Sequence, residues 1–159
     1  MAEKRFSSRP FSVLLVEDND DDVLLTKHAF KNLPVAIDFH VARNGLEALT
    51  FLRQEAPLGD ALLPHMILLD LNMPRMDGRQ LLAELKLDER LKAIPTVILT
   101  TSAADDDVLN AYRNHANAYM IKPMDIRQFA CVTKCFADFW LSDVAVLPPQ
   151  PQHEMTTCD

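Results

Sequence analysis

Five short apolar runs alternate with longer amphipathic segments, and this alternation constrains the fold more than any other feature of the chain. The runs are rich in leucine and β-branched residues and cover residues 11–16, 37–41, 66–69, 96–99 and 118–121. The segments between them repeat apolar residues at helical spacing. Because strands that alternate with helices build βαβ units, the sequence predicts a parallel sheet covered by helices.

The predicted helices begin at residues suited to helix N-termini. Three consecutive acids, residues 20–22, open the first helix, where the helix dipole favours negative charge. Asn44 has capping-box spacing to Glu47, and Asp77 suits the N-cap of a third helix. Helices are also expected at 102–115 and 125–141. The expected fold class is therefore α/β: a doubly wound, flavodoxin-like, five-stranded parallel sheet of order 2-1-3-4-5, flanked by five helices.

Composition excludes several classes of protein. The net charge is −7, which argues against a nucleic-acid binder, since that function requires a basic face. Three cysteines without framework spacing argue against a secreted disulfide protein and favour the cytoplasm. No apolar run reaches the ~18 residues of a membrane helix. The expected organisation is a flexible N-terminus at 1–10, one domain at 11–147 and a disordered tail at 148–159.

Charged and hydroxyl side chains follow four of the predicted strands. Glu17 and Asp18 follow the first strand, Asp70 the third, Thr100 the fourth and Lys122 the fifth. Sites in open parallel sheets form at the carboxyl ends of strands, so these groups are expected in one pocket. Three crowded carboxylates favour a cation, and Mg²⁺ prefers such oxygen ligands. The predicted chemistry is nucleophilic attack by Asp70 on a phosphoryl donor. Thr101 remains an alternative hydroxyl, because an error of one residue in the strand register would exchange the two.

Four segments carry a family resemblance. Leu14-Leu15-Val16-Glu17-Asp18, Asp70-Leu71-Asn72-Met73-Pro74-Arg75-Met76-Asp77-Gly78, Leu99-Thr100-Thr101-Ser102 and Tyr119-Met120-Ile121-Lys122-Pro123 resemble, in order, the signatures of response-regulator receiver domains. The resemblance covers about residues 10–141 and departs mildly at Glu17, where the acidic pair is Glu-Asp instead of Asp-Asp.

The resemblance implies a single-domain two-component response regulator that takes a phosphoryl group from a histidine kinase. It implies that Asp70 is the phosphoacceptor and that Glu17, Asp18, Asp70 and the backbone carbonyl of Asn72 bind Mg²⁺. Thr100 and Tyr119 would be the switch residues and Lys122 the phosphate-binding lysine. No turnover of a substrate is expected. The loop at 55–65, the run Thr100-Thr101-Ser102 and the ending Phe139-Trp140-Leu141 are similar to the stand-alone regulators of bacterial phytochrome kinases.

The last predicted helix has more apolar surface than one sheet face needs. Ile126, Phe129, Thr133, Phe136 and Trp140 recur at helical spacing and should face the sheet. Val132, Cys135 and Phe139 form a second ridge, which predicts a homodimer interface. The alternative is that Val132 and Phe139 pack beneath the segment 144–147.

Three functions from other classes remain as alternatives. An aspartyl phosphohydrolase would carry Asp-x-Asp, and here the second position is Asn72. A flavodoxin-type cofactor binder needs a phosphate-cradling loop after the first strand, where this chain has Glu17-Asp18-Asn19-Asp20. A phosphorylation-independent interaction module of the same fold would tolerate the loss of Asp70.

Overall fold

The computed structural model describes residues 10–33, 35–53 and 63–143. Strands and helices alternate along this part of the chain, as the apolar pattern predicts. The elements in chain order are β1 (Phe11–Val16), α1 (Asp20–Lys31), β2 (Ile37–Ala42), α2 (Gly45–Leu52), β3 (Met66–Leu69), α3 (Gly78–Leu87), β4 (Thr96–Thr100), α4 (Asp105–Arg113), β5 (Ala118–Ile121), α5 (Ile126–Asp138) and a π-helical turn, η1 (Phe139–Asp143).

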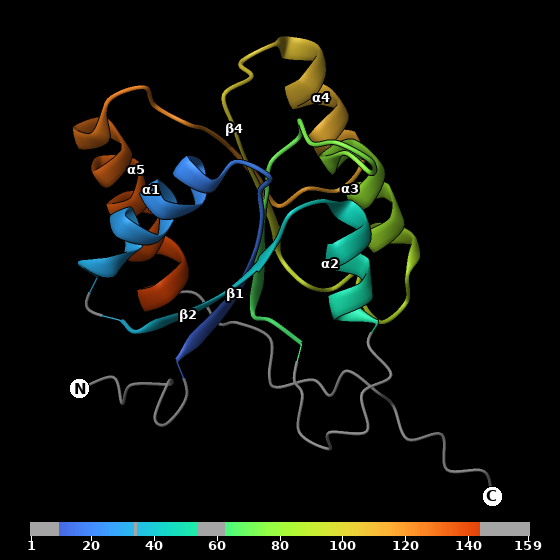
Figure 1. Ribbon diagram of the computed structural model, residues 1–159, viewed down its shortest axis with the longest axis horizontal. Helices are drawn as coiled ribbons and strands as arrows, with labels where there is room; N and C mark the ends of the chain where they lie inside the picture. The colour runs from blue at the N-terminus through green and yellow to red at the C-terminus, as the bar shows by residue number, and fades with distance from the viewer. Residues whose placement is uncertain (1–9, 34, 54–62, 144–159) are drawn as a thin grey trace, which may run out of the picture.

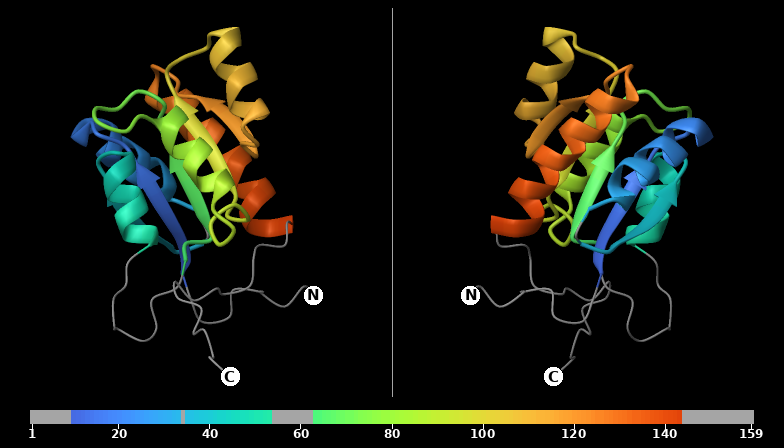
Figure 2. Two further views of the ribbon diagram at one scale, coloured as in Figure 1. Left: turned by 90° about the vertical axis from the view of Figure 1, so that its right-hand side faces the viewer. Right: turned by 90° about the vertical axis from the view of Figure 1, so that its left-hand side faces the viewer.

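The five strands form one parallel sheet of order β2-β1-β3-β4-β5, which confirms the predicted doubly wound fold. Helices α1 and α5 cover one face of the sheet, and α2, α3 and α4 lie on the other (Figure 1). The views in Figure 2 show the same two layers from either side of the sheet. All strands point the same way, so their carboxyl ends meet at one edge.

Burial differs between the central and the outer strands. Every residue of β3 and β4 is buried, because helices cover both of their faces. Strand β2 at one edge alternates between partly buried or buried and exposed residues, and the four residues of β5 at the other edge are half-buried or exposed. The site therefore stands on a rigid centre flanked by less buried margins.

The helix N-termini are capped by side chains in most cases. Asn19, not one of the three acids after it, caps α1 by accepting the backbone N–H of Asp22. Asp77 and Gln80 form a complete capping box on α3. Asn44 caps α2 as predicted, although the Glu47 carboxylate accepts the N–H of Arg43 instead of that of Asn44.

Two predictions about the later helices need correction. Helix α4 begins at Asp105, not at residue 102, because Ser102 belongs to an extended loop and its hydroxyl contacts Asp107. Ile126 was expected to face the sheet with Phe129 and Phe136, but it is 62% exposed and lines a groove between α1 and α5. Phe129, Thr133 and Phe136 are buried as predicted.

Some predicted segments lie outside the described residues: most of the flexible N-terminus, most of the loop at 55–65, the segment 144–147 and the tail at 148–159. Among the helices that the structure describes, none combines the length and the apolar character that crossing a membrane requires.

Candidate functional site

Three carboxylates meet where β1 and β3 end. These strands are neighbours, and Val16 lies opposite Leu69, so Glu17 and Asp70 emerge side by side. Oxygen atoms of Glu17, Asp18 and Asp70 all lie within 4.8 Å of one another. Glu17 is 2% exposed and Asp70 9%, whereas Asp18 is open to solvent. The predicted acidic pocket is therefore present, with two of its carboxylates largely withdrawn from water.

Lys122 reaches this pocket from the end of β5. The Lys122 backbone N–H donates to the Thr100 carbonyl at 2.7 Å and fixes the lysine beside β4. Its ammonium forms a short ion pair with Glu17 and lies 3.5 Å from Asp70 Oδ2. It also lies 3.3 Å from Asp22 Oδ2, which the sequence did not place in the site. One cation is thus shared among three carboxylates.

Burial and like charge set the protonation of this cluster. Burial raises the pKa of Glu17 to about 7; the hydrogen bond from Lys122 opposes the rise and the charge of Asp70 adds to it. Burial alone would lower the pKa of Lys122, but the hydrogen bond to Glu17 and the charges of Asp70, Glu17 and Asp22 raise it above its ordinary value. Lys122 therefore stays protonated, and the carboxylates give the cluster a net negative charge.

The donor set of this cluster suits a hard divalent cation. Carboxylate oxygens are the ligands that Mg²⁺ prefers, and Mg²⁺ retains several waters, which the exposed side of Asp18 leaves room for. Three carboxylates contact one ammonium and Asp18 adds a fourth carboxylate to the cluster, which leaves a negative surplus that a divalent ion would neutralise. Glu17, Asp18 and Asp70 thus fit a bound metal ion.

Two glycines hold the loop that follows Asp70. A Cβ on Gly78 would overlap the Asp70 carbonyl oxygen and lie 2.7 Å from Leu71 Cα, so α3 begins directly against the backbone of the candidate phosphoacceptor. A Cβ on Gly45 would lie 2.6 Å from the Met76 side chain, and the Gly45 N–H donates to the Met76 carbonyl at 3.0 Å. Close backbone approach therefore explains why glycine stands at both positions.

Asn72 lies in the same loop. Its backbone N–H donates to Asp70 Oδ1 at 3.3 Å, while its side-chain oxygen lies 3.5 Å from Arg79 Nη1. The residue is exposed and adjacent to the acidic cluster. Asn72 thus helps to orient the Asp70 carboxylate.

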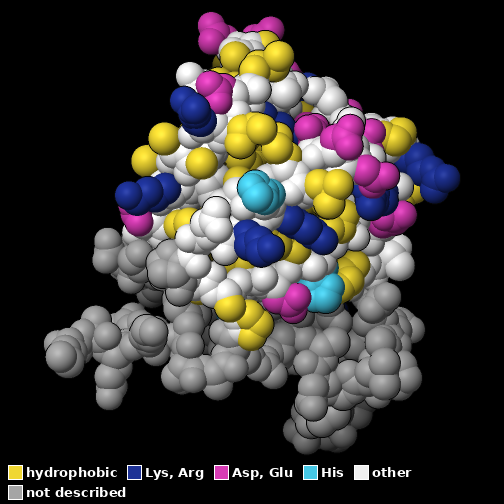
Figure 3. Space-filling model, turned by 60° about the vertical axis from the view of Figure 1, so that its left-hand side comes forward, with side chains coloured by type: hydrophobic (Ala, Val, Ile, Leu, Met, Phe, Trp, Pro, Cys, Tyr) yellow, Lys and Arg dark blue, Asp and Glu magenta, His cyan; other side chains and the backbone are white. Residues whose placement is uncertain are grey.

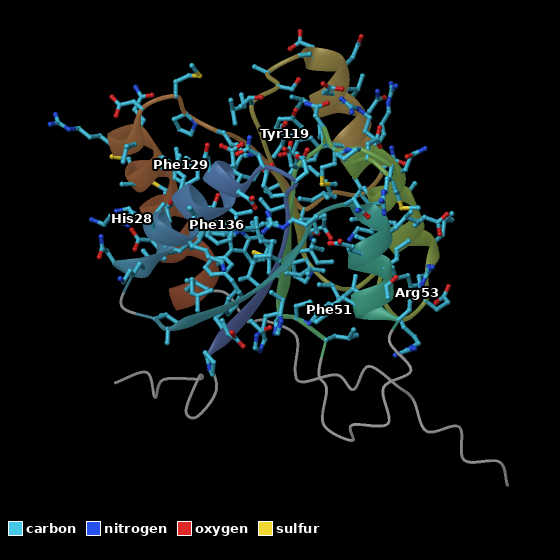
Figure 4. The ribbon with its side chains drawn as sticks, in the orientation of Figure 1. His28, Phe51, Arg53, Tyr119, Phe129 and Phe136 are labelled. Carbon is cyan, nitrogen blue, oxygen red and sulfur yellow. The ribbon has the colours of Figure 1, made fainter. Side chains whose placement is uncertain are left out.

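The two candidate switch residues lie on β4 and β5. Thr100 ends β4 and is fully buried, while the neighbouring Thr101 is exposed. The Thr100 hydroxyl accepts the Ser102 N–H at 3.5 Å. Tyr119 lies between the sheet and α4 (Figure 4), and its hydroxyl donates to the Ser102 carbonyl at 2.8 Å. Ser102 therefore connects the two predicted switch residues.

A polar chain continues from Ser102 to α3. The Ser102 hydroxyl donates to Asp107 Oδ2 at 2.6 Å, and Arg79 donates to Asp107 Oδ1 through Nη2 at 2.7 Å and Nε at 3.2 Å. These contacts lower the pKa of the Asp107 carboxyl, the hydrogen bond from Ser102 foremost, and raise that of Arg79. Arg79 also lies 3.5 Å from the Leu71 carbonyl, next to Asp70. These polar contacts connect the loop that follows Asp70 to α4.

Sequence reasoning missed part of this arrangement. Asp22 was interpreted as helix-terminal charge, and Gly45, Arg79 and Asp107 were not singled out. Asp22 lies five residues after Glu17, in the first turn of α1, and that turn brings its side chain back toward the end of β1. This spacing could have indicated Asp22. Asp107 gave no such signal, since it stands among three consecutive acids.

The proposed interface residues lie on one side of α5 and at the start of η1. Phe139 is 58% exposed, Cys135 is exposed, and Val132 is half-buried. The opposite side of the helix faces α1 across a groove of about 390 Å³, lined among others by Leu25, His28, Ile126 and Lys134. Figure 3 shows this part of the surface, where hydrophobic side chains lie among basic and histidine side chains.

Known proteins share this sequence and architecture. Residues 13–133 match the response regulator receiver domain family. The probable methanogenesis regulatory protein FilR2 of Methanothrix harundinacea is 42% identical over 132 residues, covering 83% of this chain and 84% of the relative. The response regulator Rcp1 of Synechocystis is 38% identical over 140 residues, covering 88% and 95%.

Solved structures agree with the sequence matches. The phosphorylated cyanobacterial phytochrome response regulator RcpA superposes with a TM-score of 0.80 at 40% identity, over 87% of this chain and 99% of that one. The Mn²⁺-bound form of Rcp1 gives a TM-score of 0.79 at 37% identity, over 87% and 100%. The fold and its acidic strand-end pocket define a receiver-type signalling domain. The chain belongs to the response regulator receiver domain family, and it is a homologue of the phytochrome response regulator RcpA.

Proposed function

We propose that Asp70 accepts a phosphoryl group from a sensor histidine kinase, with Mg²⁺ held by Glu17, Asp18, Asp70 and the Asn72 carbonyl. The observation that carries the proposal is the meeting of three carboxylates within 4.8 Å beside the Lys122 ammonium. The similar protein Rcp1 has been solved in a Mn²⁺-bound form, which supports a divalent ion in this fold. When bound, Mg²⁺ would neutralise charge on the carboxylates and on the transferring group.

The transfer itself needs little covalent chemistry from the chain. An oxygen of the Asp70 carboxylate attacks phosphorus as the bond from phosphorus to the donor histidine nitrogen breaks, and the imidazole leaves with its electron pair. The Asn72 N–H orients Asp70 through Oδ1, and Lys122 lies on the Oδ2 side. Lys122 then offers an N–H to a phosphoryl oxygen. The pocket therefore contributes positioning and charge, which phosphoryl transfer chiefly requires.

The signal would leave through Thr100 and Tyr119. A phosphoryl group adds charge of about −1.5 to −2 and three acceptor oxygens, which would draw the Thr100 hydroxyl toward Asp70. Ser102 accepts from Tyr119 and donates to Asp107, so a shift of this loop would disturb both contacts. We propose that phosphorylation thereby repositions Tyr119 and α4. The product is a changed protein surface, with no substrate turned over.

The kinase that we propose is of the phytochrome type. The likeness to the phytochrome response regulator RcpA covers nearly all the described residues. Exposed, free Cys131 and Cys135 suit a reducing compartment, so we place the protein in the cytoplasm. The test is phosphotransfer from a purified, autophosphorylated phytochrome kinase, with an unrelated histidine kinase as control. Label on the wild type but not on Asp70→Asn supports the proposal; preferential labelling by the unrelated kinase contradicts the phytochrome assignment.

We further propose a homodimer through the ridge that Val132 and Cys135 of α5 form with Phe139, the first residue of η1. An exposed phenylalanine beside an apolar ridge is unfavourable in water and favourable at an interface. The alternative cover for this ridge, the segment 144–147, lies outside the described residues. Phe139→Glu is expected to shift the mass measured by light scattering from dimer to monomer, whereas Leu87→Glu on α3 should leave it unchanged. An unchanged mass for Phe139→Glu would refute the interface.

A further inference from the structure

The contacts of the Lys122 ammonium include one that the proposed reaction does not use. Nζ lies 3.3 Å from Asp22 Oδ2, and it also contacts Glu17 and Asp70. An ammonium group has three N–H donors and no acceptor. Three carboxylates therefore occupy the full donor capacity of Lys122 in the unphosphorylated protein.

The three carboxylates differ in their access to water. The side chain of Glu17 is 2% exposed and that of Asp70 11%, whereas that of Asp22 is 39% exposed. A buried carboxylate that loses its partner is strongly destabilised, because water cannot replace the lost hydrogen bond. Asp22 can be hydrated when Lys122 departs. It is the contact that Lys122 can exchange at the smallest cost in free energy.

The local fold fixes Asp22 for this contact. Asn19 caps α1 by accepting the Asp22 N–H at 3.0 Å, which places the third residue of the helix over the end of β1. The neighbouring acids behave differently: Asp20 forms an exposed ion pair with Arg43, and Asp21 is exposed. Three consecutive aspartates thus occupy three different environments, and one of them faces the site.

We infer that Asp22 is a positioning residue that holds Lys122 while Asp70 is unmodified and competes with the phosphoryl group for it. The inference rests on the proposed function, because the competitor is a phosphoryl group on Asp70. That group brings three acceptor oxygens beside an ammonium with no free donor. Lys122 must exchange a contact to bind it, and Asp22 is the contact released. Removing the Asp22 charge therefore strengthens phosphoryl binding.

The experiment measures equilibrium binding of beryllofluoride, a phosphoryl mimic, to the full chain with Mg²⁺ by calorimetry. Asp22→Asn is expected to bind about two- to fivefold more tightly than the wild type, the range of a partly exposed ion pair. Asp21→Asn removes the same charge one residue away and should match the wild type. Asp22→Glu keeps a carboxylate and should restore affinity close to that of the wild type. Unchanged melting temperatures would show that each variant folds.

The outcomes separate the two proposals. Absence of beryllofluoride binding by the wild type would overturn the proposed function, and this inference with it. Binding by the wild type with equal affinity for Asp22→Asn and Asp21→Asn would overturn the role of Asp22 alone. Weaker binding by Asp22→Asn would also overturn it, since competition predicts a gain and structural damage a loss.

Discussion

The two halves of the site are built in different ways. At the β1–β3 half, Glu17 and Asp70 follow neighbouring strands whose last four residues are all buried, and Gly78 lets α3 begin directly against the Asp70 backbone. At the β4–β5 half, α4 is loosely packed: of its residues, all of which the structure describes, Ala111 alone is buried. Polar contacts through Arg79, Asp107 and Ser102 tie this half to the rest.

This difference assigns the two halves different tasks. A group that must present oxygens at fixed distances to a metal and a phosphoryl donor belongs on rigid, buried strands. A segment that must change position needs few apolar contacts, because such segments open at small cost in free energy. The hydrogen bonds from Ser102 to Asp107 and from Tyr119 to Ser102 can exchange with water, whereas the packing of β3 cannot. We therefore propose that the carboxylates of the first half carry the phosphoryl chemistry, with Lys122 reaching them from the end of β5, and that α4 and its loop carry the response.

The largest effect on stability is expected at the rigid half. Gly78→Ala would drive a Cβ into the Asp70 carbonyl and Leu71 Cα, which are backbone atoms that cannot turn aside. We expect the free energy of unfolding in urea to fall by about 3 kcal/mol. Leu87→Ala, at an 80% exposed position late in the same helix, should change it by less than about 0.5 kcal/mol. Small, equal losses of stability in Gly78→Ala and Leu87→Ala would show that Gly78 does not lie this close to the Asp70 backbone.

A second effect follows from the pKa of Glu17. In the folded, metal-free protein this pKa is raised to about 7 from 4.5, so the folded state binds the proton more tightly than the unfolded state. The stabilisation is complete below pH 4.5 and is lost as pH rises to 7, by at most about 3 kcal/mol. Urea denaturation in chelator from pH 5 to 8 checks this. Glu17→Gln should make the free energy of unfolding nearly independent of pH in this range. An equally steep dependence in that variant would show that another group titrates.

The flexible half should respond locally. Arg79→Ala removes both hydrogen bonds to Asp107. We expect less than about 1 kcal/mol in global stability but about three- to tenfold faster amide hydrogen exchange in α4. The matched control is Arg53→Ala, which removes ion pairs with Asp88 at 3.1 Å and Glu84 at 3.6 Å at the C-terminal ends of α2 and α3, away from Ser102 and Tyr119. Equal amide exchange rates in α4 for the two variants would show that apolar packing, and not the contacts of Arg79 with Asp107, keeps α4 in place.

The smallest effect is expected at Arg75, in the loop after Asp70. This residue has φ 65°, a left-handed conformation that non-glycine residues adopt with strain. Arg75→Gly removes that strain and adds flexibility to the unfolded chain, so stability should rise by at most about 1 kcal/mol. Thermal melting checks the sign. A clear loss of stability would mean that the Arg75 side chain contributes to the loop.

The sequence predicts the β1–β3 half of the site better than the β4–β5 half. The strands, their order and the strand-end residues Glu17, Asp70 and Lys122 could be predicted, because buried runs mark strands and parallel strands end at one edge. The start of α4 could not, because Ser102 resembles an N-cap while its hydroxyl bonds to Asp107 in three dimensions. The contact of Asp22 with Lys122 was missed because Asp22 stands in a run of three acids, all of which suit a helix N-terminus.

The most direct test is whether the protein gains a covalent phosphoryl group on Asp70. The full chain would be incubated with Mg²⁺ and a small acyl-phosphate donor. Its intact mass would be recorded together with that of Asp70→Asn and of Asp88→Asn, a control at the C-terminal end of α3. The account predicts a gain of one phosphoryl group in the wild type and in Asp88→Asn, and none in Asp70→Asn or with chelator. A wild type that gains no phosphoryl group, or an Asp70→Asn variant that gains one equally, would contradict the assignment of Asp70 as the phosphoacceptor.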